Sequence, residues 1–140
     1  MAPPDDNQAR NDFDNMSVDR ASFAFKNLMG IDKWTLWTPV FTGLTLVGTP
    51  VYTGRFRFVG RQCFFQVQMV PGTTIASVAG TSYMALPSTA LGLGGMATMT
   101  NDSTNVAVGV CHIDAATSRA YLPAQAASGS TFTLAGWLEV

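Results

Sequence analysis

The chain has 140 residues, which is enough for one domain with a hydrophobic core. Charged residues make up only 12% of it and the formal net charge is -1, so the whole molecule has no net attraction for nucleic acid or an anionic membrane. No stretch has the roughly 18 consecutive apolar residues of a membrane span, and the first residues lack the apolar core of a signal peptide. We therefore expect no membrane span, no nucleic-acid partner and synthesis in a cytoplasm.

The acidic residues are concentrated at the start of the chain. Six of the nine precede residue 33, namely Asp5, Asp6, Asp12, Asp14, Asp19 and Asp32. Residues 1–16 combine most of these acids with prolines and almost no apolar side chains, a composition typical of extended or disordered segments. The sequence therefore predicts an extended N-terminal arm.

A short helix is predicted after the arm, over residues 17–29. Ser17 is a candidate N-cap, Asp19 lies in the first turn, Lys26 lies near the end, and Gly30 is a stop signal. One side of the helix is apolar, formed by Ala21, Phe25, Leu28 and Met29 and widened by Phe23 and Ala24. Because an isolated helix of this length is marginal in water, we expect it to pack on its own subunit or on another chain.

Residues 34–140 are predicted to form an all-β body, preceded by the arm and helix of residues 1–33. The runs VYTGRFRFV and QCFFQVQMV flank Gly60-Arg61, a two-residue loop with glycine first, which predicts a type II′ hairpin. Further short runs are TSYMALP, GMATMT, NVAVGVCHI, SRAYLP and TFTLAGWLEV, with turns expected between them, the last over 127–130. About seven or eight antiparallel strands favour a β-sandwich of jelly-roll type.

Alternation within two of these runs predicts which side chains form the core. In QCFFQVQMV the inward set is Cys63, Phe65, Val67 and Met69, and the outward set is Phe64, Gln66 and Gln68. In the closing run the inward set is Phe132, Leu134, Leu138 and Val140, and the outward set is Thr131, Thr133, Trp137 and Glu139. An outward tryptophan indicates contact with a partner.

The sequence gives little support to catalysis or to a metal site. Cys111 and His112 are neighbours on one predicted strand, so their side chains point to opposite faces and are poorly placed to share a proton. The body has only three acids for a carboxylate pair, Asp102, Asp114 and Glu139. There is no CxxC, no HxxxH and no acid-rich loop. We expect no catalytic residue, no metal and no cofactor.

The two cysteines, Cys63 and Cys111, are expected to be free, buried thiols, because cysteine packs like a small hydrophobe. A single bridge between them is also compatible with the sequence.

Arg55, Arg57 and Arg61 are unusual in a chain with so little charge. At positions i and i+2 the first two project from one face of a strand, and Arg61 lies in the turn that follows. The sequence favours a solvated or subunit-lining face for them. Two alternatives remain: contact with an acidic partner or with the acidic arm itself, and binding of nucleic acid or glycan.

The middle of the chain predicts a homo-oligomer. Between Arg61 and Arg119 the only formal charges are Asp102 and Asp114. A monomer normally needs mixed surface charge for solubility, whereas obligate subunit interfaces are depleted of charge. We therefore expect part of this neutral surface to be buried between subunits.

The run WTPVFTGLTLVGTPVYTGRFRFVGRQCFFQVQMVPGTT, with YMALP and the closing TLAGWLEV, resembles the small β domains of tailed-bacteriophage tail fibres and related appendages. The resemblance covers about three quarters of the chain. It implies a non-enzymatic virion structural protein of the fibre, head-fibre or adaptor/decoration type, located in the virion. Together with the composition it favours a homotrimer. It also implies that the N-terminal segment attaches to capsid, portal or tail through Phe13, Phe23, Phe25, Leu28 and Met29.

The resemblance leaves a second function open, a lectin-like module that binds a glycan on the host surface. Exposed aromatic side chains would then stack on sugar rings, and the candidates are Trp37, Tyr121 and Trp137. The alternative for each is packing in the core or in an interface.

Overall fold

The structure is a computed structural model that describes residues 33–90 and 94–140. Every regular element in these two ranges is a β-strand, so the all-β prediction is confirmed. The predicted arm and helix lie outside the described residues. The strands are β1 (Thr35–Trp37), β2 (Phe41–Thr42), β3 (Thr45–Val47), β4 (Val51–Val59), β5 (Gln62–Val70), β6 (Thr74–Ser77), β7 (Tyr83–Ala85), β8 (Gly95–Asn101), β9 (Val106–Asp114), β10 (Arg119–Tyr121), β11 (Gln125–Ser128) and β12 (Phe132–Glu139).

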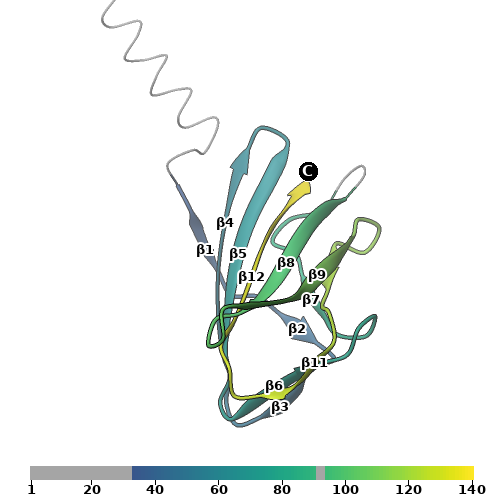
Figure 1. The fold of residues 1–140 in the computed structure, drawn as a ribbon. Helices are drawn as coiled ribbons and strands as arrows, with labels where there is room; N and C mark the ends of the chain where they lie inside the picture. Colours follow the sequence, from purple (N-terminus) through teal and green to yellow (C-terminus); the bar gives the residue numbers. More distant parts are fainter. Residues whose placement is uncertain (1–32, 91–93) are drawn as a thin grey trace, which may run out of the picture.

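Nine of these strands form one antiparallel sheet, in the order β1-β4-β5-β12-β8-β9-β10-β7-β2. Figure 1 shows β4, β5 and β12 side by side in this sheet. The C-terminal strand β12 lies between β5 and β8, and it pairs with both along almost its whole length. The end of the chain therefore holds the centre of the sheet together.

The large sheet is curled, which brings its two edge strands, β1 and β2, close together in space. Only residues 38–40 separate β1 from β2, and four Cα steps reach at most about 14 Å. The ring centroids of Phe41 in β2 and Tyr52 in β4 are 4.7 Å apart. The sheet forms a curled half-barrel, and the two packed layers of the predicted sandwich are not confirmed.

A second, three-stranded sheet, β11-β6-β3, covers one end of the core. In Figure 1 it lies at the end opposite the β4–β5 turn. Ile75 in β6 is fully buried in the core, and the hydroxyl of buried Ser77 donates to the carbonyl oxygen of Pro123 at 2.7 Å. The predicted turn over 127–130 is wrong at its start, because β11 continues to Ser128 and pairs there with Ile75.

The core is filled by the inward side chains that alternation predicts. In β5 the buried residues are Cys63, Phe65, Val67 and Met69, and in β12 they are Phe132, Leu134 and Leu138. Val140 is partly buried against the same cluster. Both cysteines are free and buried, which confirms the prediction of free thiols.

Two glycines allow the tight geometry of the central strands. Gly60 has φ 59 in the two-residue β4–β5 turn, while Arg61 has no positive φ, so the predicted type II′ turn fits and type I′ does not. Gly136 lies between Phe65 and Ala97 in the sheet, and a Cβ at this position would collide with the Cβ of Ala97 and the carbonyl oxygen of Met96. The curled sheet therefore requires a glycine in the middle of β12.

Candidate binding surface

The outer face of the large sheet carries a row of aromatic and cationic side chains. Strand register places Arg57 opposite Phe64, Phe64 opposite Trp137, and Trp137 opposite Met96. Trp34, one residue before β1, continues the row beyond Arg57. We call Trp34, Arg55, Arg57, Phe64 and Trp137 the arginine–aromatic strip.

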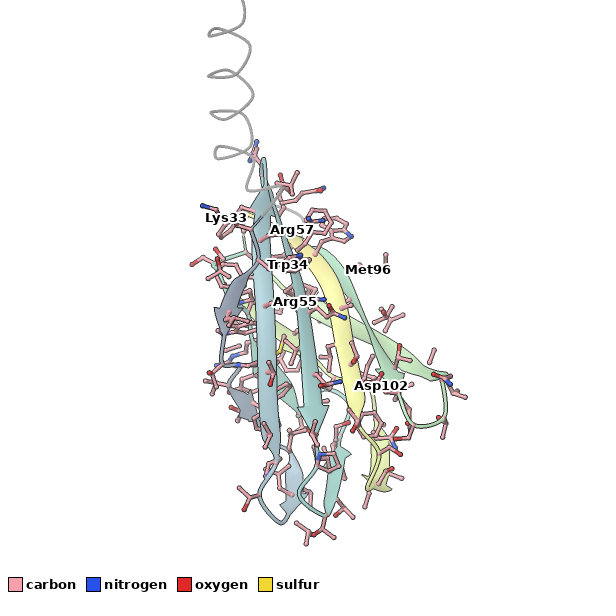
Figure 2. The ribbon with its side chains drawn as sticks, turned by 90° about the vertical axis from the view of Figure 1, so that its left-hand side faces the viewer. Lys33, Trp34, Arg55, Arg57, Met96 and Asp102 are labelled. Carbon is pink, nitrogen blue, oxygen red and sulfur yellow. The ribbon has the colours of Figure 1, made fainter. Side chains whose placement is uncertain are left out.

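The two arginines of this strip enclose one tryptophan. The guanidinium carbons of Arg55 and Arg57 each lie 4.9 Å from the ring centroid of Trp34. Arg57 also lies 5.9 Å from the ring centroid of Phe64. Such cation–π contacts hold a charged group flat against an aromatic ring. Figure 2 shows Trp34, Arg55 and Arg57 together on one face, with Met96 further across the sheet.

Arg55 is also fixed by a hydrogen bond to its cross-strand neighbour. Its Nε donates to Oε1 of Gln66 at 3.0 Å, and its Nη2 donates to the same oxygen. The prediction that Arg55 and Arg57 share the outward face of β4 is confirmed by the register. The two side chains thus form a fixed pair of positive charges on the outer face.

Arg61 is separated from this pair. It lies in the β4–β5 turn, and its Nη2 is 3.6 Å from Oε1 of Glu139, with the arginine side chain 80% exposed. An exposed ion pair of this kind contributes little to stability. Arg61 lines a hollow with Trp137 and Glu139, so it lies apart from Arg55 and Arg57, although the sequence grouped it with them.

A shallow groove runs beside the strip on the same face. It has a volume of about 320 Å³ and is lined by Leu36, Arg55, Gln66, Gln68 and Thr133, among others. Amide and hydroxyl groups lie along its floor, and Leu36 is 80% exposed. The groove can therefore offer hydrogen bonds and apolar contact to an extended segment.

A second aromatic group lies further along the outer face, on β9, β10 and β7. Tyr121 pairs with His112 on one side and with Tyr83 on the other. The ring centroids of Tyr121 and Tyr83 are 5.6 Å apart, and those of Tyr121 and His112 are 6.3 Å apart. The guanidinium carbon of Arg119 lies 4.3 Å from the centroid of Tyr83.

An open hollow of about 340 Å³ adjoins this group, with Gly80, Val110, His112, Tyr121 and Pro123 in its wall. Its lining is mostly apolar. Hollows of the same volume also adjoin Trp137 and Trp37.

The three predicted stacking residues do not lie together. Trp37 packs edge-on against Phe56 at a centroid distance of 6.3 Å, and its ring lies over Gly54 on the core side of the sheet. Trp137 lies in the arginine–aromatic strip, and Tyr121 lies beside the hollow. The anchoring candidates Phe13, Phe23, Phe25, Leu28 and Met29 lie outside the described residues.

Phe64 and Met96 were not selected as site residues from the sequence. They meet Arg57 and Trp137 only through cross-strand register, which joins residues far apart in the chain. The one signal in the sequence is the alternation that places Phe64 on the outward face of its strand.

The groups considered for catalysis lie apart in the structure. Cys111 is buried and His112 is exposed, which confirms that they point to opposite faces. Asp102 accepts a hydrogen bond from the Thr133 hydroxyl at 2.7 Å, and Asp114 accepts one from the Thr117 hydroxyl at 2.6 Å, which lowers the pKa of Asp114. Within residues 33–90 and 94–140, no three His, Cys, Asp or Glu side chains group as metal ligands.

The fold and the surface together define an all-β protein with a half-barrel body and a neutral, partly aromatic outer face. No helix in the described ranges is long and apolar enough to cross a membrane. Comparison with protein families, curated proteins and solved structures found no match to the chain.

Proposed function

We propose that this chain is a non-enzymatic structural protein of a tailed-bacteriophage virion, of the fibre, head-fibre or adaptor/decoration type. In this proposal its N-terminal segment binds capsid, portal or tail proteins. The β body self-associates, as a trimer, and is displayed outward. The sequence resemblance supports the virion role, and the outer face of the large sheet supports self-association.

One row of side chains on that face carries the argument for self-association. Register joins six outward positions on β1, β4, β5, β12, β8 and β9 in turn, and they are Leu36, Arg55, Gln66, Ala135, Thr98 and Val110. Arg55 is the only charged residue in the row, and its charge is engaged by Gln66. Leu36 and Val110, at the two ends, are 80% and 64% exposed.

The neighbouring row has no charged residue, with Thr53, Gln68, Thr133 and Thr100 in register. Arg55 is the single charged residue in the two rows, and such a surface resembles a subunit interface more than a solvated surface. Burial against a second and a third copy would remove the exposed aliphatic side chains from water.

Two measurements test the proposal. Light scattering on the full chain at micromolar concentration is expected to give the mass of a trimer, and a monomeric mass would contradict self-association. Removal of residues 1–30 is expected to abolish incorporation into particles while the oligomer persists. If the truncated protein still enters particles, the attachment role of this segment is wrong.

A second function, glycan binding, is favoured by the hollow beside Tyr121 and His112. An aromatic wall next to a concave surface is the geometry by which sugar rings are commonly held. A glycan array on the wild-type chain tests this function. Reproducible binding that is lost in Tyr121→Ala and kept in Trp137→Ala would favour it over a purely structural role, and an array without binding would reject it.

A further inference from the structure

The charges of the chain are divided between two parts of opposite sign. Residues 1–16 hold four aspartates and one arginine, and residues 17–32 hold two acids and two bases. Residues 33–140 hold five bases and three acids. The body is therefore net positive, and the excess of negative charge lies in the first sixteen residues.

Three of the five bases of the body lie at one end of the sheet. Arg55 and Arg57 enclose Trp34 on the outer face, and Lys33 precedes Trp34 in the chain at the same end (Figure 2). The other two bases have separate positions, because Arg61 pairs with Glu139 and Arg119 lies over Tyr83. We call Lys33, Trp34, Arg55 and Arg57 the basic end of the strip.

The N-terminal segment joins the body at this same place. Residue 32 is bonded to Lys33, and the ring of Trp34 lies against both arginines. Whatever path residues 17–32 take, residues 1–16 are tethered to the basic end and not to a remote part of the sheet.

We propose that residues 1–16 bind, in the free protein, to the basic end of the strip on their own chain. The aspartate carboxylates are the partners of the guanidinium and ammonium groups there, through charge-assisted hydrogen bonds. The contact is confined to these charged groups beside Trp34, so it leaves Gln66 and Gln68 to the proposed subunit interface.

Reach and concentration both allow binding within one chain. Sixteen linking residues span up to about 50 Å when extended, while the nine residues of β4 are only about 30 Å long. A short tether gives the segment an effective concentration on the order of millimolar at the basic end. Weak individual ion pairs are then sufficient for occupancy.

This inference stands independently of the virion role. It states which segment covers the basic end before any partner is present. A partner that binds either residues 1–16 or the strip must displace the contact, so attachment and exposure of the strip are coupled.

A spin label on the segment tests the proposal in the full-length protein. In Ala9→Cys the new thiol is the reactive one, because Cys63 and Cys111 are buried. In low salt the label is expected to broaden the Trp34 indole N–H signal and the Arg55 and Arg57 amide signals. Gly129, which follows β11 at the far end of the body, is expected to keep its signal.

Added salt and neutral substitutions test whether residues 1–16 are held at the basic end by electrostatic attraction. Broadening should be lost at about 1 M salt, where the Debye length falls to about 3 Å. It should also be lost in Asp5→Asn/Asp6→Asn/Asp12→Asn/Asp14→Asn, a variant that leaves the body unchanged. The control Arg119→Gln, with one positive charge removed elsewhere on the sheet, should keep it.

Three outcomes would overturn the proposal. One is the absence of broadening, or equal broadening over the whole body. Another is broadening that survives the asparagine variant. The third outcome comes from mixing two kinds of chain, one isotope-labelled without a spin label and one spin-labelled without isotopes. If the signals of the isotope-labelled chains broaden, residues 1–16 bind the basic end of a neighbouring copy and not that of their own chain.

Discussion

Trp34 and Trp37 lie on opposite faces of the same sheet. The ring of Trp34 is held by Arg55 and Arg57 on the outer face. The ring of Trp37 packs against Phe56 and covers Gly54, where an added Cβ would lie 2.6 Å from Cε3 of the tryptophan. One tryptophan therefore belongs to the surface and the other to the packing of the half-barrel.

Alanine substitutions should separate these roles. Trp37→Ala is expected to lower the free energy of unfolding by about 2–4 kcal/mol, because it removes a partly buried ring and leaves a void above Gly54. Trp34→Ala should cost less than about 1 kcal/mol, the range of an exposed cation–π contact. Urea unfolding of both variants measures the difference, and equal losses would contradict the assignment of faces.

Gly136 should tolerate no side chain. Gly136→Val is expected to destabilise the protein by about 3 kcal/mol, because its side chain would overlap Ala97 and the Met96 carbonyl in the middle of the sheet. Ala135→Val is the matched control, since Ala135 precedes Gly136 and is exposed on the outer face. Thermal unfolding should show a much lower Tm for Gly136→Val and a nearly unchanged Tm for Ala135→Val.

The sequence was sufficient for the strands with strong alternation. Cys63 to Met69 and Phe132 to Leu138 place apolar side chains at every second position, so their faces were predicted correctly. Glycine at the first position of the two-residue loop predicted the β4–β5 turn. These features depend on neighbours in sequence, and sequence patterns report such neighbours well.

Features that depend on pairing between distant strands were not predicted. β2 has two residues and β3 has three, which is too short for alternation to be recognised. The approach of the two sheet edges follows from the strand order and not from any local pattern. The arginine–aromatic strip was missed as a unit for the same reason, because register brings Arg57, Phe64 and Trp137 together.

Charges introduced at the two ends of the outward row, at Leu36 and Val110, should weaken self-association through the outer face. Leu36→Lys/Val110→Lys places two ammonium groups where exposed aliphatic side chains now stand. If this face is buried between subunits, the double variant should sediment as a monomer, because an unpaired buried charge is costly.

Val47→Lys is the control for this experiment, since Val47 is 53% exposed but lies in the small sheet. Analytical ultracentrifugation of the wild type, the double variant and Val47→Lys gives the oligomeric state of each, and Val47→Lys should keep the wild-type mass. An unchanged mass for Leu36→Lys/Val110→Lys would place the interface elsewhere.

The buried thiols should make stability depend on pH in the alkaline range. Burial raises the pKa of Cys63 to about 11 and that of Cys111 to about 12, above the ordinary thiol pKa of 9.0. The folded chain therefore keeps both protons at a pH where the unfolded chain has lost them. The unfolded state then binds fewer protons, so the free energy of unfolding falls as the pH rises above about 9.

Urea unfolding at pH 8 and pH 10 measures the fall in the free energy of unfolding. The variant Cys63→Ala/Cys111→Ala should show a smaller fall between the two pH values. The two proteins differ only at the two cysteines, so the difference between their pH dependences isolates the thiols. The same burial predicts that Ellman's reagent reacts with neither cysteine in the folded protein and with both in urea. Rapid reaction without denaturant would show that the sheet opens around Cys63 or Cys111, because a thiolate must reach solvent before it can react.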